Sequence, residues 1–161
     1  MKDCFEGKIW LLGDDISVED ILPSKVLYKQ DVLNEKDAMK FVFEDYYKDW
    51  YKYVKNGDII VAGKNFGWGS SRPAPRILKE MGISCIVVES ASRLFFRNSI
   101  HIGVPIIICE NITKYLKNNE YIKVNIVNGI VENEEKNIKI KGVGIPKNSP
   151  PYEIIQSGGI W

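Results

Sequence analysis

The sequence has little of what metal centres and disulfide frameworks require. It contains a single histidine, His101, and only three cysteines among 161 residues. An odd number of widely spaced cysteines with no CxxC pair favours reduced thiols, packed as small apolar side chains, over disulfides or metal-cluster ligands. We therefore expect this chain to bind no metal of its own. We expect its three thiols to lie in the core: Cys4, Cys85 and Cys109.

Strong net charge, long apolar runs and a secretory leader are also missing. Lysine and arginine number 22 against 21 aspartates and glutamates, so the net charge of +1 creates no field that would attract nucleic acid or anionic lipid. The longest apolar run, residues 104–109, is far shorter than the ~20 residues of a membrane span. Residues 1–10 lack a basic start followed by an apolar stretch. We expect a cytoplasmic protein with neither nucleic acid nor membrane as partner.

The composition itself is that of an ordinary globular chain, with 45% hydrophobic and 27% charged residues. At ~100 to 200 residues per domain, the length fits one domain. We find no internal repeat, linker or low-complexity stretch that would divide it. The expectation is a single domain over residues 1–161.

Short apolar segments predict buried, parallel strands in the first two thirds of the chain. They lie at residues 9–12, 59–62, 83–88 and 104–109. Further on, segments of alternating hydrophobicity flank Asn128-Gly129, a hairpin turn signal that predicts a more exposed antiparallel pair. The two members of that pair would be residues 121–127 and 138–140.

Helices are predicted between these strands. In residues 34–54 apolar side chains recur every three or four positions, which predicts one helix with an aromatic stripe packed in the core, comprising Tyr46, Tyr47, Trp50, Tyr51 and Tyr53. A second helix would begin at Pro73 and stop at Gly82. A third would run from a cap at Ser90 to Asn98.

The most informative segment is a glycine-rich loop, residues 63–72, between a predicted strand and a predicted helix. Backbone N–H groups of such a loop converge with the positive end of the helix, which suits an anion. Arg72 adds a planar fork that can bind a carboxylate or phosphate in a bidentate way. Neither the dinucleotide fingerprint nor the P-loop spacing is matched. A purely structural turn, with Gly67 and Gly69 at positive φ, is the alternative.

Three segments together resemble the swivelling domain of the aconitase superfamily. Residues 65–72, NFGWGSSR, resemble its signature NFGxGSSR, and residues 90–105, SASRLFFRNSIHIGVP, are similar to its SFARIFxRNxIxxGxP segment. Residues 13–23 resemble its N-terminal GDx[IV]xTDxI[IL]P. The resemblance implies a three-layer β/β/α domain of the α/β class. The length matches the stand-alone small subunit of the family, typified by isopropylmalate dehydratase.

The resemblance also implies a chemistry. Family members remove and re-add water on a hydroxy di- or tricarboxylate, with a four-iron four-sulfur cluster on a large subunit and none on the small one. Ser70 would be the catalytic base, Arg72 would hold a substrate carboxylate, and Ser71 would assist it. Such a hydroxyl acts as a base only where N–H groups and a guanidinium stabilise its alkoxide. Gly69 and Asn65 of the same loop are the further expected substrate contacts.

Several positions depart from the family pattern and bear on the substrate. Pro73 stands where the family usually has glutamate, and Glu19 replaces the aspartate of the N-terminal motif as a substrate contact. The loop after Pro23 corresponds to the family's specificity region, where Tyr28 and its apolar neighbours suggest a hydrocarbon branch on the substrate. This favours 3-isopropylmalate, a leucine-biosynthesis intermediate. A 2,3-dimethylmalate or homoaconitase-type substrate and a non-catalytic carboxylate-binding module stay as alternatives.

Overall fold

A computed structural model describes residues 2–24, 35–69 and 73–160. Its strands form a mixed sheet in the order β4-β3-β2-β1-β5-β6-β7. The parallel half consists of β1 (Cys4–Leu11), β2 (Ile59–Ala62), β3 (Cys85–Val88) and β4 (Ile106–Ile108). The antiparallel half consists of β5 (Tyr121–Asn125), β6 (Ile130–Asn133) and β7 (Ile138–Lys141).

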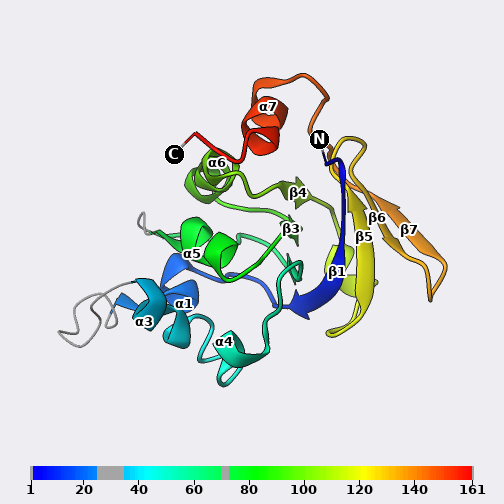
Figure 1. Ribbon diagram of the computed structural model, residues 1–161. Coiled ribbons are helices and arrows are strands. Elements are labelled where there is room, and N and C mark those ends of the chain that lie inside the picture. The colour runs from blue at the N-terminus through cyan, green and yellow to red at the C-terminus, as the bar shows by residue number, and fades with distance from the viewer. Residues whose placement is uncertain (1, 25–34, 70–72, 161) are drawn as a thin grey trace.

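Strand β1 joins the two halves because different parts of it pair with different neighbours. Its first five residues pair with β5, whereas Ile9, Trp10 and Leu11 pair with β2. The antiparallel strands therefore curl away from the parallel ones, and α5 (Ala74–Glu80) and α6 (Arg93–Ile102) cover the other side of the parallel strands (Figure 1). The layers are β, β and α, which confirms the fold class expected from the sequence.

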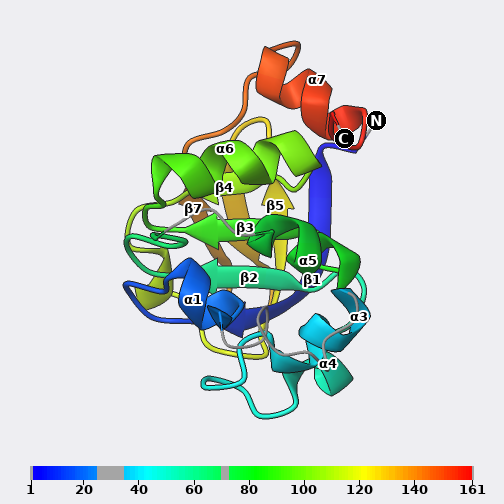
Figure 2. The ribbon, with the colours of Figure 1, turned by 90° about the vertical axis from the view of Figure 1, so that its left-hand side faces the viewer.

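The remaining helical elements are short. The turned view shows α7 next to α6 (Figure 2). Their bounds are α1 (Val18–Ile21), α3 (Glu35–Ala38), η1 (Met39–Phe41), α4 (Trp50–Tyr53), η2 (Ile112–Lys114) and α7 (Pro150–Gln156). No helix within the described ranges is both long enough and apolar enough to span a bilayer.

Burial explains why each half uses its own strand type. All residues of β2 and β3 are buried, as parallel strands covered on both faces require. Strand β7 instead alternates between half-buried and exposed residues. Two thiols, Cys85 and Cys109, lie in the core as expected, whereas Cys4 is only half buried; all three are free.

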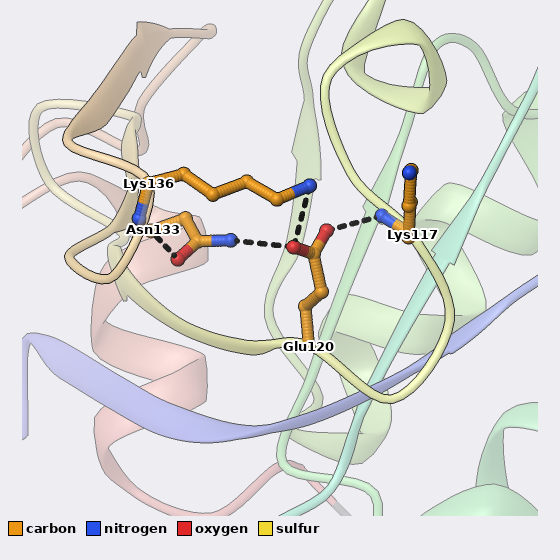
Figure 3. A network of polar contacts seen from close by, with 4 residues as sticks. All are labelled: Lys117, Glu120, Asn133 and Lys136. Atoms are coloured by element: carbon orange, nitrogen blue, oxygen red, sulfur yellow. Dashed lines mark hydrogen bonds and ion pairs between the residues drawn. The ribbon is translucent and has the colours of Figure 1, made fainter.

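The antiparallel half is tied together by a polar network around Glu120, just before β5 (Figure 3). Its carboxylate accepts hydrogen bonds from the Lys136 ammonium at 2.6 Å, from the Asn133 amide at 3.2 Å and from the Lys117 backbone N–H. Partial burial alone would raise the pKa of Glu120, but these donors, Lys136 above all, lower the pKa below its ordinary value. The network holds the β6–β7 turn against the start of β5.

Three sequence predictions about elements were wrong in detail. Residues 35–53 form α3, η1, turns and α4 rather than one helix, and Phe43 and Asp49 have positive φ. Of the aromatic stripe, Trp50 is buried, whereas Tyr46 and Tyr53 are exposed. The cap of α6 is Ser92, two residues after the predicted Ser90, and the helix extends to Ile102.

The hairpin prediction was right about the turn and wrong about one partner. Asn128 and Gly129 do connect antiparallel strands, but the strand that pairs with β5 is β6, and residues 138–140 belong to a third strand beside it.

Candidate functional site

Three loops meet at one edge of the sheet, where β1, β2 and β3 end. The three sequence segments that resemble the aconitase swivelling domain begin in these loops. Gly63 N–H donates to Gly13 O at 3.1 Å and Asp15 N–H to Lys64 O at 2.8 Å, which links the first two loops. Phe66 is linked to the third through Ser90 O and Ser92 N–H, both at 3.0 Å. The carboxyl edge of parallel strands is where α/β proteins bind their ligands.

Gly67 holds the middle of the glycine loop in place. It has φ +77°, and its N–H donates to Ile16 O at 2.6 Å. A Cβ atom here would lie 2.3 Å from Cγ of Phe95, a buried ring on α6 that packs edge-on against Phe66. Ser92, the cap of α6, donates from its hydroxyl to Gly67 O at 3.0 Å. The positive φ and the close packing against Phe95 both require glycine at this position, and the loop is anchored to the cap of α6 as well as to the segment before α1.

Asn65 and Gly69 are the two predicted substrate contacts that the structure describes on this loop. Asn65 has φ +59°, its N–H donates to Ser90 Oγ at 2.8 Å, and its exposed side-chain amide donates to Asp15 Oδ1 at 3.2 Å. Gly69 is exposed with φ +113°, and a Cβ there would meet Val18 at 3.1 Å. The Asn65 amide therefore keeps free hydrogen-bonding capacity at an exposed edge.

Trp68 lies between Asn65 and Gly69, and hydrogen bonds hold both its side chain and its backbone. Its indole N–H donates to Asp15 O at 2.9 Å, and its backbone O accepts from Val18 N–H at 2.8 Å. Helix α1 begins beside it with a capping box in which Ser17 and Asp20 satisfy each other's backbone N–H groups. Trp68 as a whole is still 46% exposed. An anchored but exposed aromatic side chain next to Gly69 provides an apolar wall at the mouth of the loop.

Glu19, the third described candidate, lies on α1. Its exposed carboxylate accepts from Ser24 N–H at 2.9 Å and from Ser24 Oγ at 3.0 Å. Ser24 is the last described residue before residues 25–34, and Glu19 thus fixes the chain at the end of this described range.

Four predicted residues lie outside the described ranges: Ser70, Ser71, Arg72 and Tyr28. The first three connect Gly69 to Pro73, and both ends of that connection are described. Pro73 caps α5 without a side-chain hydrogen bond, and the first turn of α5 carries no acidic residue. The roles of these four residues stay predictions.

The two buried thiols, Cys85 and Cys109, do not suit an iron–sulfur cluster. Burial raises the pKa of the Cys85 thiol to about 12, and burial with the nearby Glu89 carboxylate raises the pKa of Cys109 to about 11. Cluster ligands are thiolates, which these environments disfavour. Within the described ranges, no group of three histidine, cysteine or acidic side chains is arranged to hold a metal ion.

Two residues of the site were given no role from sequence alone. Asp15 accepts from both Asn65 and Trp68, and Ser92 fixes Gly67. Both lie inside the recognised segments, but only the folded chain brings them to the glycine loop.

Comparison with known proteins agrees with this geometry. The aconitase C-terminal domain family matches residues 15–111. The 3-isopropylmalate dehydratase small subunit of Halothermothrix orenii is 38% identical over 96% of this chain and 92% of its own length. The isopropylmalate/citramalate isomerase small subunit of Methanocaldococcus jannaschii is 37% identical over 99% of this chain and 93% of its own length.

A solved structure extends the likeness to three dimensions. The crystal structure of 3-isopropylmalate dehydratase from Methanocaldococcus jannaschii superimposes with a TM-score of 0.85 and 29% identity, covering 98% of this chain and 90% of that one. Relatives of this chain are thus small subunits of hydro-lyases. The chain belongs to the aconitase C-terminal domain family, with the fold of its swivelling domains.

Proposed function

We propose that this chain is the small subunit of a two-subunit hydro-lyase that isomerises 3-isopropylmalate by dehydration and rehydration, a step of leucine biosynthesis. The observation that carries the proposal is the match to 3-isopropylmalate dehydratase small subunits over nearly the whole chain. The gathering of all three family segments at one sheet edge supports it. Residues 1–161 would act as one swivelling domain, and the free thiols favour the cytoplasm.

The proposed division of labour follows from the chemistry of each group. Arg72 holds a substrate carboxylate with its planar fork, and Ser71 and Asn65 add hydrogen bonds. Ser70 removes the proton from the carbon beside that carboxylate, and N–H groups of the loop stabilise its alkoxide. Glu19 braces the segment that contains Tyr28, which faces the variable part of the substrate. The four-iron four-sulfur cluster expected on the large subunit would supply a Lewis acid for the departing hydroxyl.

The identity of the acid is the finer part of the proposal. One relative is named for both isopropylmalate and citramalate, so related small subunits are associated with different alkyl groups. The apolar wall formed by Trp68 favours a hydrocarbon branch over a further carboxylate. We therefore rank 3-isopropylmalate first, with citramalate and 2,3-dimethylmalate next and homocitrate last.

The test is an anaerobic assay of this chain mixed with its cognate large subunit on each of these acids. We expect turnover on one or two of the alkylmalates and none with this chain alone. Ser70→Ala should lower kcat by about a thousandfold, the scale on which a reacting group of this kind acts. Arg72→Lys should mainly raise KM because a bidentate contact is lost. Ser157→Ala, just after α7, is the matched control.

Each failure has its own meaning. Full activity of Ser70→Ala would remove Ser70 as the base while leaving the enzyme assignment. No turnover on any acid, with an intact cluster on the large subunit, would contradict the enzyme assignment. Calorimetry with the same acids would then show whether the chain is a carboxylate-binding module, whose affinity would depend on Arg72.

A further inference from the structure

A second cavity lies outside the candidate site, between α6 and α7. Its volume is about 580 Å³, within the ~300 to 1,000 Å³ typical of small-molecule sites. Both ribbon views show α7 beside α6 (Figures 1 and 2). The segment that follows α7 is tied to the last turn of α6, where the Ile160 N–H donates to His101 O at 2.9 Å. The cavity is therefore part of the folded chain rather than a gap at a loose terminus.

The cavity is lined by apolar side chains and by a row of basic side chains. The apolar part includes Phe96 and Ile100 from α6 and Ile154 from α7. The basic part is a row on α6, at positions i, i+4 and i+8, which share one face of a helix: Arg93, Arg97 and His101. None of the described residues that line the cavity is acidic.

In the neighbouring cavity beside α5, which has a volume of about 780 Å³, the basic side chains already have hydrogen-bond or ion-pair partners. There Arg76 pairs with Glu80 at 3.7 Å, and the Lys79 ammonium donates to Ile102 O at 2.7 Å and Gly158 O at 2.8 Å. Arg93 and Arg97 make no ion pair or hydrogen bond with any described residue, and both are exposed. Two arginines one turn apart can both bind one oxyanion.

We propose that the α6–α7 cavity binds a small amphipathic anion, a carboxylate or phosphate monoester attached to a hydrocarbon body. The anionic group lies between Arg93 and Arg97, and the hydrocarbon body packs against Phe96 and Ile154. Apolar contact gives affinity, and the two guanidinium groups give selectivity for a negative charge.

The cavity is joined to the candidate site by Ala91. This residue lines the cavity and also pairs with Phe66 of the glycine loop in a short parallel bridge. The next residue, Ser92, donates the hydrogen bond that fixes Gly67 O. An occupant beside Arg93 therefore lies against the segment that holds the glycine loop, and its binding should perturb the amide signals of Phe66 and Gly67.

The experiment is an NMR titration of the full ¹⁵N-labelled chain with hexanoate, hexyl phosphate and hexanol. We expect saturable shifts at amides of α6, α7 and Phe66 with both anions, and binding of hexanol at least about tenfold weaker. The double variant Arg93→Gln/Arg97→Gln should weaken hexanoate about tenfold or more and leave hexanol unchanged, since hydrogen bonds to a charged group are lost. Arg76→Gln, in the other cavity, should change neither.

Equal binding of hexanoate and hexanol, or an unchanged affinity in the double variant, would overturn the proposal. Amide chemical-shift changes confined to residues of the α5 cavity would also overturn it. If the large subunit, added in excess, protects α6 and α7 from hydrogen exchange and abolishes hexanoate binding, the surface is a subunit interface and the proposal is wrong. No readout depends on turnover, so the result is independent of the proposed hydro-lyase activity.

Discussion

The two halves of the sheet divide the work of this molecule. In the parallel half, β2 and β3 are wholly buried, and their loops are linked to one another by backbone hydrogen bonds. In the antiparallel half, the strands alternate between the core and solvent, and side-chain contacts such as the Glu120 network hold the turns. The candidate site lies at the end of the parallel half because neighbouring parallel strands have their carboxyl ends at one edge, which brings successive loops together.

The core of the parallel half should carry most of the stability. Ile86 in β3 is fully buried between two strands, whereas Ile140 in β7 is only partly buried. Ile86→Ala should lower the free energy of unfolding by about 4 kcal/mol and Ile140→Ala by about 1 kcal/mol, because the cavity left behind is smaller at an exposed edge. Urea denaturation of both variants measures the difference. Equal losses of unfolding free energy in the two variants would contradict the expectation that the parallel half carries most of the stability.

Gly67 should be the less replaceable of two glycines that both have positive φ. Gly67→Ala places a methyl group against Phe95, so we expect a loss of about 3 kcal/mol. Gly158 has φ +86°, and no atom lies within 4 Å of the point that an added methyl group would occupy, so Gly158→Ala should cost only about 1 kcal/mol. Thermal denaturation of the two variants separates the cost of steric overlap from the cost of backbone strain. Similar losses of stability in both would show that the Phe95 ring moves aside.

Ser92 should matter more than an ordinary helix cap. Ser92→Ala removes the cap of α6 and the hydrogen bond to Gly67 O, for a combined loss of about 2 kcal/mol. Ser149→Ala removes only the cap of α7, for about 1 kcal/mol. In the two-subunit assay, Ser92→Ala should also lower kcat, whereas Ser149→Ala should not. Equal activity in both variants would mean that the loop keeps its geometry without this bond.

The smallest expected effect lies in the antiparallel half. Glu120→Gln should cost about 1 kcal/mol at pH 7, because the ammonium of Lys136 loses its carboxylate. The pKa of Glu120 is lowered in the folded chain, so the carboxylate stabilises above its unfolded pKa of about 4.3 and this stabilisation is lost as pH falls through the folded pKa. The difference in the free energy of unfolding between the wild-type chain and Glu120→Gln should therefore disappear below about pH 4.

Denaturation at several pH values measures that gap. Glu132→Gln breaks a 4.0 Å pair with the exposed Lys139 and should change stability by less than about 0.5 kcal/mol at any pH. A constant gap for Glu120→Gln across the whole range would mean that the ion pair contributes nothing.

The segment before β2 shows where reading the sequence fails. Helical spacing in residues 34–54 is real, but the chain there turns at Phe43 and Asp49. The turns bring Phe43 and Trp50 into edge-on contact at 5.0 Å, and Trp50 contacts Trp10 of β1 at 5.8 Å. Burying these rings together stabilises more than one continuous helix would, and this preference depends on a strand far away in sequence.

The sequence by itself determined the parallel strands, the glycine loop that follows one of them and the family to which the chain belongs, because these features are written in short, local patterns. Only the tertiary structure decided that Asp15 and Ser92 fix the glycine loop, and that Arg93 and Arg97 face a cavity beside α7. Those relations join residues that are distant along the chain, and a periodic pattern describes only neighbours on one element.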